Sequence, residues 1–83
     1  MELSFEEKRI LLGLNITYYR RAKKLTQSQL AERICVSSNY LSQIERGFKT
    51  VSLITLTQIS EVLEIDEGDL LDFSRGNNTR RMR

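Results

Sequence analysis

The apolar residues of the chain recur at helical spacing, and a repeated start signal divides them into five segments. In this signal an apolar residue precedes a capping residue, and a second apolar residue follows five positions after the first. Such a pair packs across the first helical turn, while the capping side chain accepts a hydrogen bond from a backbone N–H. Ser4 with Glu7 offers a capping box at the front of the chain. The apolar pairs are Leu25 and Leu30, Val36 and Leu41, Val51 and Leu56, and Ile65 and Leu70, with the caps Thr26, Ser37, Ser52 and Asp66.

Helix breakers are scarce, because the chain has no proline and four glycines. We therefore predict five helices, at about 5–24, 27–34, 38–46, 53–64 and 67–73, joined by short connections. The expected fold class is all-α, a compact five-helix bundle over residues 1–73, followed by a disordered basic tail at 74–83. The side chains expected to be buried are Leu12, Ile16, Tyr19 and Ala22, then Leu30, Ala31 and Ile34, then Leu41 and Ile44, then Leu53, Leu56, Ile59, Val62 and Leu63, and finally Leu70 and Leu71.

The predicted helix at 38–46 differs from the others because its outward side is polar but uncharged. Leu41 and Ile44 face the core, and the connection at 35–37 is tight enough to cross this helix steeply over the preceding one. Solvated helix faces usually carry Glu and Lys, whereas amides and hydroxyls match base edges in the major groove of B-DNA. The pattern favours DNA reading over an ordinary solvated surface. The outward positions are Ser38, Asn39, Ser42 and Gln43.

The charges are distributed unevenly along the chain, although the net charge is only +2. Residues 15–50 carry seven basic and two acidic side chains, whereas residues 51–73 carry six acidic side chains and no basic one. A basic segment followed by an acidic one suggests a protein that turns one side toward a polyanion. Solvated helix faces would be the alternative explanation.

The composition argues against an enzyme and against a metal or cofactor site. There is no histidine, which removes the usual general base and metal ligand. The single cysteine, Cys35, forms no internal disulfide and is either a small packed hydrophobe or a redox sensor. No phosphate loop, membrane-spanning run or signal peptide is evident. We expect a cytoplasmic protein with no cofactor, no evident small-molecule ligand and no membrane association.

One sequence pattern is specific. LTQSQLAERICVSSNYLSQIERG, followed by SLITLTQISEVLEIDEGDLL, contains T-Q-x-x-L-A, S-x-x-Y-L-S-x-I-E-R-G and S-L-x-T-L. This pattern, which covers roughly residues 10–72, resembles the lambda-repressor/Cro-like helix-turn-helix family, also called the XRE family. The resemblance implies that the third helix lies in the major groove of DNA.

The resemblance also implies roles for individual residues. Glu45 and Arg20 match a buried or half-buried structural salt bridge that aims the third helix. Glycine is frequent in the family at the positions held here by Lys24 and Cys35, and a side chain there costs about 1 kcal/mol if φ is positive. The ring of Tyr40 has core packing as an alternative role. The implied base-reading residues are Ser38, Asn39 and Gln43, with Ser42 a further candidate, and the implied phosphate contacts are Gln27, Tyr40, Arg46 and Lys49.

The expected function is that of a small transcriptional regulator, more a repressor than an activator, which binds an operator as a homodimer. One unit contacts only a few base pairs, so a palindromic double-stranded site and a dimer are expected. The alternatives are a controller protein of a restriction–modification system and an antitoxin-type module that binds another protein. The predicted dimer interface is Ile65, Leu70, Leu71 and Phe73.

Overall fold

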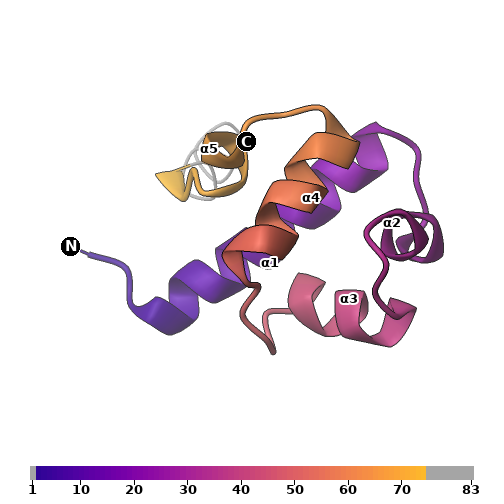
Figure 1. Cartoon of the computed structure of the whole chain (residues 1–83). Coiled ribbons are helices and arrows are strands. Elements are labelled where there is room, and N and C mark those ends of the chain that lie inside the picture. Colours follow the sequence, from indigo (N-terminus) through magenta and orange to yellow (C-terminus); the bar gives the residue numbers. More distant parts are fainter. Residues whose placement is uncertain (1, 75–83) are drawn as a thin grey trace.

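A computed structural model describes residues 2–74, whose regular structure consists of five α-helices (Figure 1). All five begin at the predicted residues and end one to three residues earlier than predicted. The all-α prediction is thereby confirmed for the described residues. The predicted tail at 74–83 lies, apart from Ser74, outside them. The helices are α1 (Phe5–Ala22), α2 (Gln27–Arg33), α3 (Ser38–Glu45), α4 (Leu53–Leu63) and α5 (Glu67–Leu70).

The helix starts are set by local hydrogen bonds of the predicted capping residues. Ser4 Oγ accepts from the Glu7 backbone N–H at 3.1 Å, and the Glu7 carboxylate accepts in return from the Ser4 N–H at 2.8 Å. Thr26 forms the same reciprocal box at the start of α2. Ser37 and Ser52 cap α3 and α4 through their hydroxyl oxygens. Each such cap contributes about 1 kcal/mol, because it satisfies a backbone donor that the helix leaves open.

The ends of α1, α2, α3 and α4 share a second local motif, in which a single residue just after the helix adopts a left-handed conformation. Lys24, Cys35 and Glu64 have φ values of 60°, 61° and 60°, and Gly47 has a φ of 80°. After α1, for example, the Lys24 N–H donates to the Arg21 carbonyl, and the Leu25 N–H donates to the Arg20 carbonyl. This paired pattern is the Schellman motif. The expected strain at the two non-glycine positions Lys24 and Cys35 is therefore present, and Glu64 adds a third.

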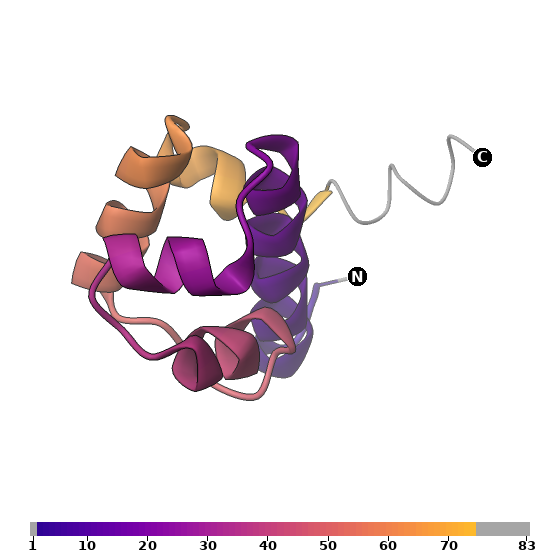
Figure 2. The same cartoon turned by 90° about the vertical axis from the view of Figure 1, so that its right-hand side faces the viewer.

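The core draws on all five helices. Figure 2 shows α1 at one edge of the bundle, with α2, α3 and α4 to one side of it. Burying one such aliphatic side chain contributes roughly 1.5–3 kcal/mol, so the bundle depends on the close fit of a small set. The buried apolar residues are Ile16, Leu30, Ala31, Ile34, Leu41, Ile44, Leu56, Ile59, Leu63 and Leu70.

The burial predictions were wrong at three positions. Leu53 is 77% exposed and Leu71 is 45% exposed, and Ala22 is exposed as well. All three lie at helix ends: Leu53 opens α4, Leu71 follows α5, and Ala22 closes α1. A side chain at an end can extend beyond its packing partner, so helical spacing alone does not bury it. Leu12, Tyr19 and Val62 are only partly buried and pack against the core.

A glycine inside α1 allows that helix to approach α3 closely. A Cβ on Gly13 would lie 2.4 Å from the Glu45 carbonyl oxygen and 2.6 Å from that of Ile44. One helical turn earlier, Arg9 Nε donates a hydrogen bond of 2.7 Å to the Gly47 carbonyl. The backbone contact at Gly13 and the Arg9 bond therefore fix the end of α3 against α1. None of the helices in residues 2–74 is long and apolar enough to span a membrane.

Candidate nucleic-acid interface

The two sides of α3 have the chemical character that the sequence predicted. Leu41 and Ile44 are 0% and 1% exposed, so they anchor the helix in the core. Ser38 and Asn39 are exposed, and the other two outward positions are partly exposed. The helix itself lies at the lower edge of the bundle in both views (Figures 1 and 2). None of Ser38, Asn39, Ser42 and Gln43 is buried against the protein.

The start of α3 is joined to α2 by a polar contact. Ser38 Oγ donates to Ser28 Oγ at 3.2 Å. Both hydroxyls are exposed, and a hydroxyl can donate and accept at once. Ser28 was not singled out from the sequence, where a serine in the first turn of a helix resembles any other early polar residue. The contact places Ser28 beside the polar side of α3.

The predicted salt bridge between Arg20 and Glu45 is confirmed. Arg20 Nε donates to Glu45 Oε2 at 2.7 Å and Nη2 donates to Oε1 at 3.0 Å. The two side chains are only 8% and 4% exposed. Arg20 Nη1 also donates to the Leu25 carbonyl at 2.9 Å. A two-point guanidinium–carboxylate pair is directional, so it fixes the orientation of the end of α3 relative to α1.

Two further side chains converge on the same carboxylate. Thr17 Oγ1 and Gln27 Nε2 each donate to Glu45 Oε1 at 2.9 Å. No buried side-chain nitrogen or oxygen among the described residues lacks a hydrogen-bond partner. The network thus joins α1, α2 and α3 at one point. Neither Thr17 nor the link from Gln27 to Glu45 was found from the sequence, because the partners are far apart along the chain.

Gln27, the predicted phosphate contact at the first position of α2, is therefore held by the protein itself. Its amide nitrogen gives one N–H to Glu45, and a primary amide has two such donors. The side chain is partly exposed. This geometry leaves one donor for an external anion, while Glu45 fixes the orientation of the amide. The phosphate contact itself stays a prediction.

The segment that follows α3 presents a cation, an aromatic ring and a second cation. The guanidinium carbon of Arg46 lies 4.8 Å from the centre of the Phe48 ring, which is 63% exposed. Lys49 is exposed next to it. Tyr40 is partly buried and packs against the core, as its alternative role required. Phe48 was not identified from the sequence, because a single aromatic residue in a connection carries no spacing signal.

The predicted dimer interface needs one correction. Leu70 is 0% exposed and belongs to the core of its own chain, so it is not available to a partner. Asn15 reinforces this placement, since its Nδ2 donates to the Leu70 carbonyl at 2.8 Å and to the Asp72 carbonyl at 3.3 Å. Leu71 is exposed, whereas Ile65 and Phe73 are partly buried.

An ion pair outside α3, between Lys23 and Glu64, joins the ends of α1 and α4. The hydrogen bond from Lys23 and its positive charge lower the pKa of the Glu64 carboxyl below the ordinary value.

Cys35 is exposed, so the prediction of a packed hydrophobe was wrong. Within residues 2–74 no group of three or more Cys, Asp or Glu side chains is arranged to hold a metal ion.

The fold and the polar side of α3 define a DNA-binding transcriptional regulator. A helix-turn-helix family model matches residues 16–70. The chain belongs to this family, as its motif had indicated. It is similar to the control protein C.BamHI of Bacillus amyloliquefaciens, with 37% identity over 71 residues that cover 84% of this chain and 88% of C.BamHI.

Solved structures agree with this assignment. The clp gene regulator ClgR from Corynebacterium glutamicum superposes with a TM-score of 0.78 at 34% identity, over 89% of this chain and 79% of ClgR. The biofilm regulator SinR, in a crystal structure with DNA, gives a TM-score of 0.69 at 38% identity, over 72% of this chain and 97% of that one. SinR of Bacillus subtilis is longer than this match: the aligned 63 residues, 40% identical, cover 75% of this chain and 57% of SinR.

Proposed function

We propose that the protein is a repressor that binds a palindromic operator as a homodimer and reads the major groove with α3. The observation that carries the proposal is the outward, uncharged polar side of α3 opposite the buried Leu41 and Ile44. An α-helix of ordinary diameter fits the major groove, and its amide and hydroxyl groups match the donors and acceptors on base edges. Such a protein acts where the chromosome is, in the cytoplasm.

The four outward residues of α3 read bases in this proposal. Asn39 and Gln43 are suited to adenine, because the oxygen of a primary amide can accept from the adenine N6 amino group while its N–H donates to adenine N7. Ser38 and Ser42 can take either role. The opposite side of α3 is buried in the core, so the four side chains keep fixed positions relative to one another along the groove.

Phosphate contacts position this helix. Gln27 has a second amide N–H that Glu45 does not use, and it lies beside the C-terminal end of α3. Arg46 and Lys49 bring positive charge to the segment after α3, and the Tyr40 hydroxyl is the fourth predicted contact. Contacts of this kind set affinity and register but carry no sequence information. The Arg20–Glu45 pair acts indirectly, through the placement of Gln27 and the end of α3.

The homodimer rests on the geometry of operators. Two recognition helices must sit about 34 Å apart, one turn of B-DNA, to read two half-sites from one side. We place the two-fold contact at the end of α4 and at α5, around Ile65, Leu71 and Phe73. The acidic side chains of residues 61–72 suit a surface that is turned away from DNA.

The decisive experiment is selection of bound fragments from random duplexes by the full chain, followed by titration at two salt concentrations. We expect an enriched palindrome whose affinity falls steeply with salt, because bound phosphates release counterions. Failure to enrich any sequence would contradict base reading by α3. Affinity without salt dependence would contradict the phosphate contacts and favour a protein-binding module.

A controller protein of a restriction–modification system is the second candidate. The similarity to C.BamHI over most of both chains favours it. This candidate predicts that the selected palindrome lies upstream of the protein's own gene, beside a nuclease gene. A palindrome found only at unrelated genes would exclude the controller role and leave the general repressor role intact.

A further inference from the structure

One face of α1 carries a row of exposed apolar side chains. Ile10, Leu14 and Tyr18 are 47%, 55% and 55% exposed, and their spacing of four aligns them along the helix. Glu7 and Arg21 continue the same stripe toward its two ends, and both are exposed. We call these five residues the α1 outer face.

The neighbours of α1 explain why this face is open. Gly13 abuts the end of α3, and the Asn15 side chain donates to the backbone carbonyl of Leu70 at the end of α5. Leu14 lies between them in sequence, so helical geometry directs its side chain between those two elements and away from the core. In Figure 2, α1 accordingly stands at the edge of the bundle with its helical neighbours on one side.

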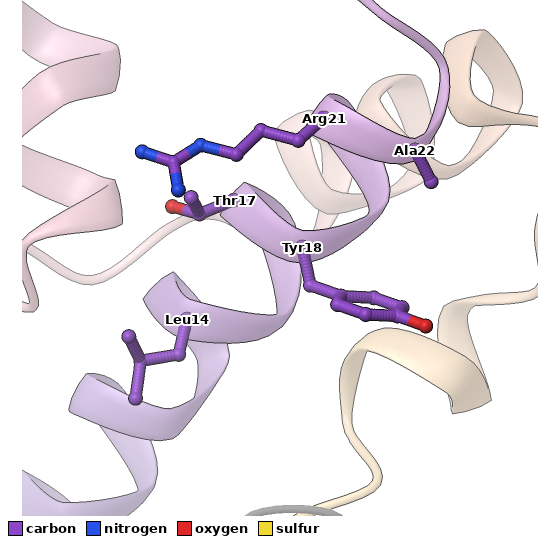
Figure 3. Close-up of a pocket in the computed structure, with 5 residues that line it drawn as sticks. All are labelled: Leu14, Thr17, Tyr18, Arg21 and Ala22. Carbon is purple, nitrogen blue, oxygen red and sulfur yellow. The ribbon is translucent and has the colours of Figure 1, made fainter.

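The surface of this face is hollowed. Figure 3 shows a pocket lined by side chains of α1 alone, in which Arg21 extends over Thr17 while Tyr18 points the other way. Leu14, Thr17, Tyr18, Arg21 and Ala22 line this pocket. Adjacent large apolar side chains exposed in this way mark interaction surfaces.

The charges on the α1 outer face identify the partner. Glu7 lies seven residues before Leu14 and Arg21 lies seven residues after it, each about 10 Å along the helix. If a second α1 packs antiparallel across a two-fold axis at Leu14, each Glu7 meets the partner's Arg21, and each Ile10 meets the partner's Tyr18. The capping box uses only Glu7 Oε1, so the other carboxylate oxygen can accept from the guanidinium. The face is therefore complementary to itself, as an isologous contact requires.

We propose that the α1 outer face binds the same face of a second copy of this chain, antiparallel, with the two Leu14 side chains at the two-fold axis. The contact is separate from the one around α5 and does not depend on DNA. A single helix face buries less area than a standard stable interface, so we expect association in the micromolar range or weaker.

Cross-linking tests the register of this contact apart from any other interface. Cys35→Ser removes the native thiol, and Leu14→Cys then places a thiol at the proposed axis. Facing positions of packed helices are close enough for a disulfide. We expect Leu14→Cys to form a covalent dimer on mild oxidation without DNA. Ile54→Cys, at a position 69% exposed on α4, is the matched control and should remain monomeric.

Mixtures of cysteine variants test the antiparallel direction. Ile10→Cys and Tyr18→Cys should cross-link with each other far more than either does with itself. Efficient Ile10-to-Ile10 cross-linking would overturn the antiparallel arrangement, and equal yields for Leu14→Cys and Ile54→Cys would overturn the contact altogether. Neither result would bear on base reading by α3, which is tested with DNA.

A charge exchange in the Leu14→Cys background tests the Glu7–Arg21 contact. Arg21→Glu alone and Glu7→Lys alone each set like charges opposite one another, and each should lower the cross-linking yield about fivefold. A mixture of these two variants restores opposite charges at both contacts and should restore the yield. Glu7→Lys also removes a capping box, so circular dichroism confirms that it is folded under the assay conditions. A mixture that cross-links no better than its components would overturn the proposal.

Discussion

Arg20 and Glu45 form a two-point ion pair that joins the last turn of α1 to the last residue of α3. The pair is buried, and Thr17 and Gln27 complete the hydrogen bonding of the carboxylate. One structural interaction therefore determines both the orientation of α3 and the direction in which Gln27, the first residue of α2, points its amide. Under the proposed function, stability and DNA binding are coupled at this position.

Removal of one partner of this pair should be strongly destabilising. Glu45→Ala strands the buried Arg20 charge, and we expect the free energy of unfolding to fall by about 3–5 kcal/mol. Urea denaturation followed by circular dichroism measures this change. Glu32→Ala, an exposed carboxylate on α2, is the control and should change stability by less than about 0.5 kcal/mol. Equal small effects from the two variants would show that the pair does not hold α3.

Gln43→Ala and Gln27→Ala should separate base reading from anchoring. The loss of Gln43 should cost about 1–3 kcal/mol of binding free energy and relax the preference at one base pair. The loss of Gln27 should weaken binding to all sequences about equally. Fluorescence anisotropy on the selected palindrome and its single-base variants measures both effects. Gln58→Ala on α4 is the control. Identical, sequence-independent losses for Gln43 and Gln27 would contradict the division of roles.

Gly13→Ala should destabilise the protein although alanine favours helices. The new Cβ would lie 2.4 Å from the Glu45 carbonyl, so α1 and α3 must separate. Overpacking costs about 1–3 kcal/mol, and a contact this short with a backbone atom lies at the upper end of that range, above the gain in helix propensity of about 1 kcal/mol. Gly68→Ala meets nothing within 4 Å and should be neutral or stabilising. Thermal unfolding of both variants compares the two glycines directly.

Lys24→Gly should stabilise the protein by up to about 1 kcal/mol. Lys24 has a φ of 60°, where a Cβ is strained and glycine is not. The loss is limited to an exposed side chain after the end of α1. Lys8→Gly, within the helix, is the control and should destabilise by about 1 kcal/mol. A lower midpoint of urea unfolding for Lys24→Gly would show that the left-handed residue is not strained.

The carboxyl group of Glu64 should titrate below the usual range for glutamate. Lys23 lowers its pKa through a hydrogen bond and through its charge. Because the folded-state pKa is lowered, the stabilising contribution is fully present above the ordinary glutamate pKa and is lost as the pH falls through the lowered value. NMR titration of the side-chain carbonyl measures the pKa. Lys23→Met should return it toward the ordinary value, and an unchanged midpoint would exclude the pair.

The starts of the helices were determined by the sequence itself. Ser4, Thr26, Ser37 and Ser52 bond to a backbone N–H three residues later, so the whole signal lies within one turn. The polar side of α3 could be predicted for the same reason, because residues four apart on a helix share a face whatever surrounds it. The Arg20–Glu45 pair was predicted only through the family resemblance.

Other features were decided only when the helices packed. Gln27 and Glu45 are 18 positions apart, and Gly13 meets the Glu45 carbonyl only because α1 crosses the end of α3. Leu70 and Leu71 look alike in sequence, yet one is fully buried and the other is exposed. Helical spacing gives the direction of a side chain relative to its own axis, whereas burial depends on where the neighbouring helices end. Which side chains are buried therefore depends on how the helices pack against one another, and no single segment of the sequence determines it.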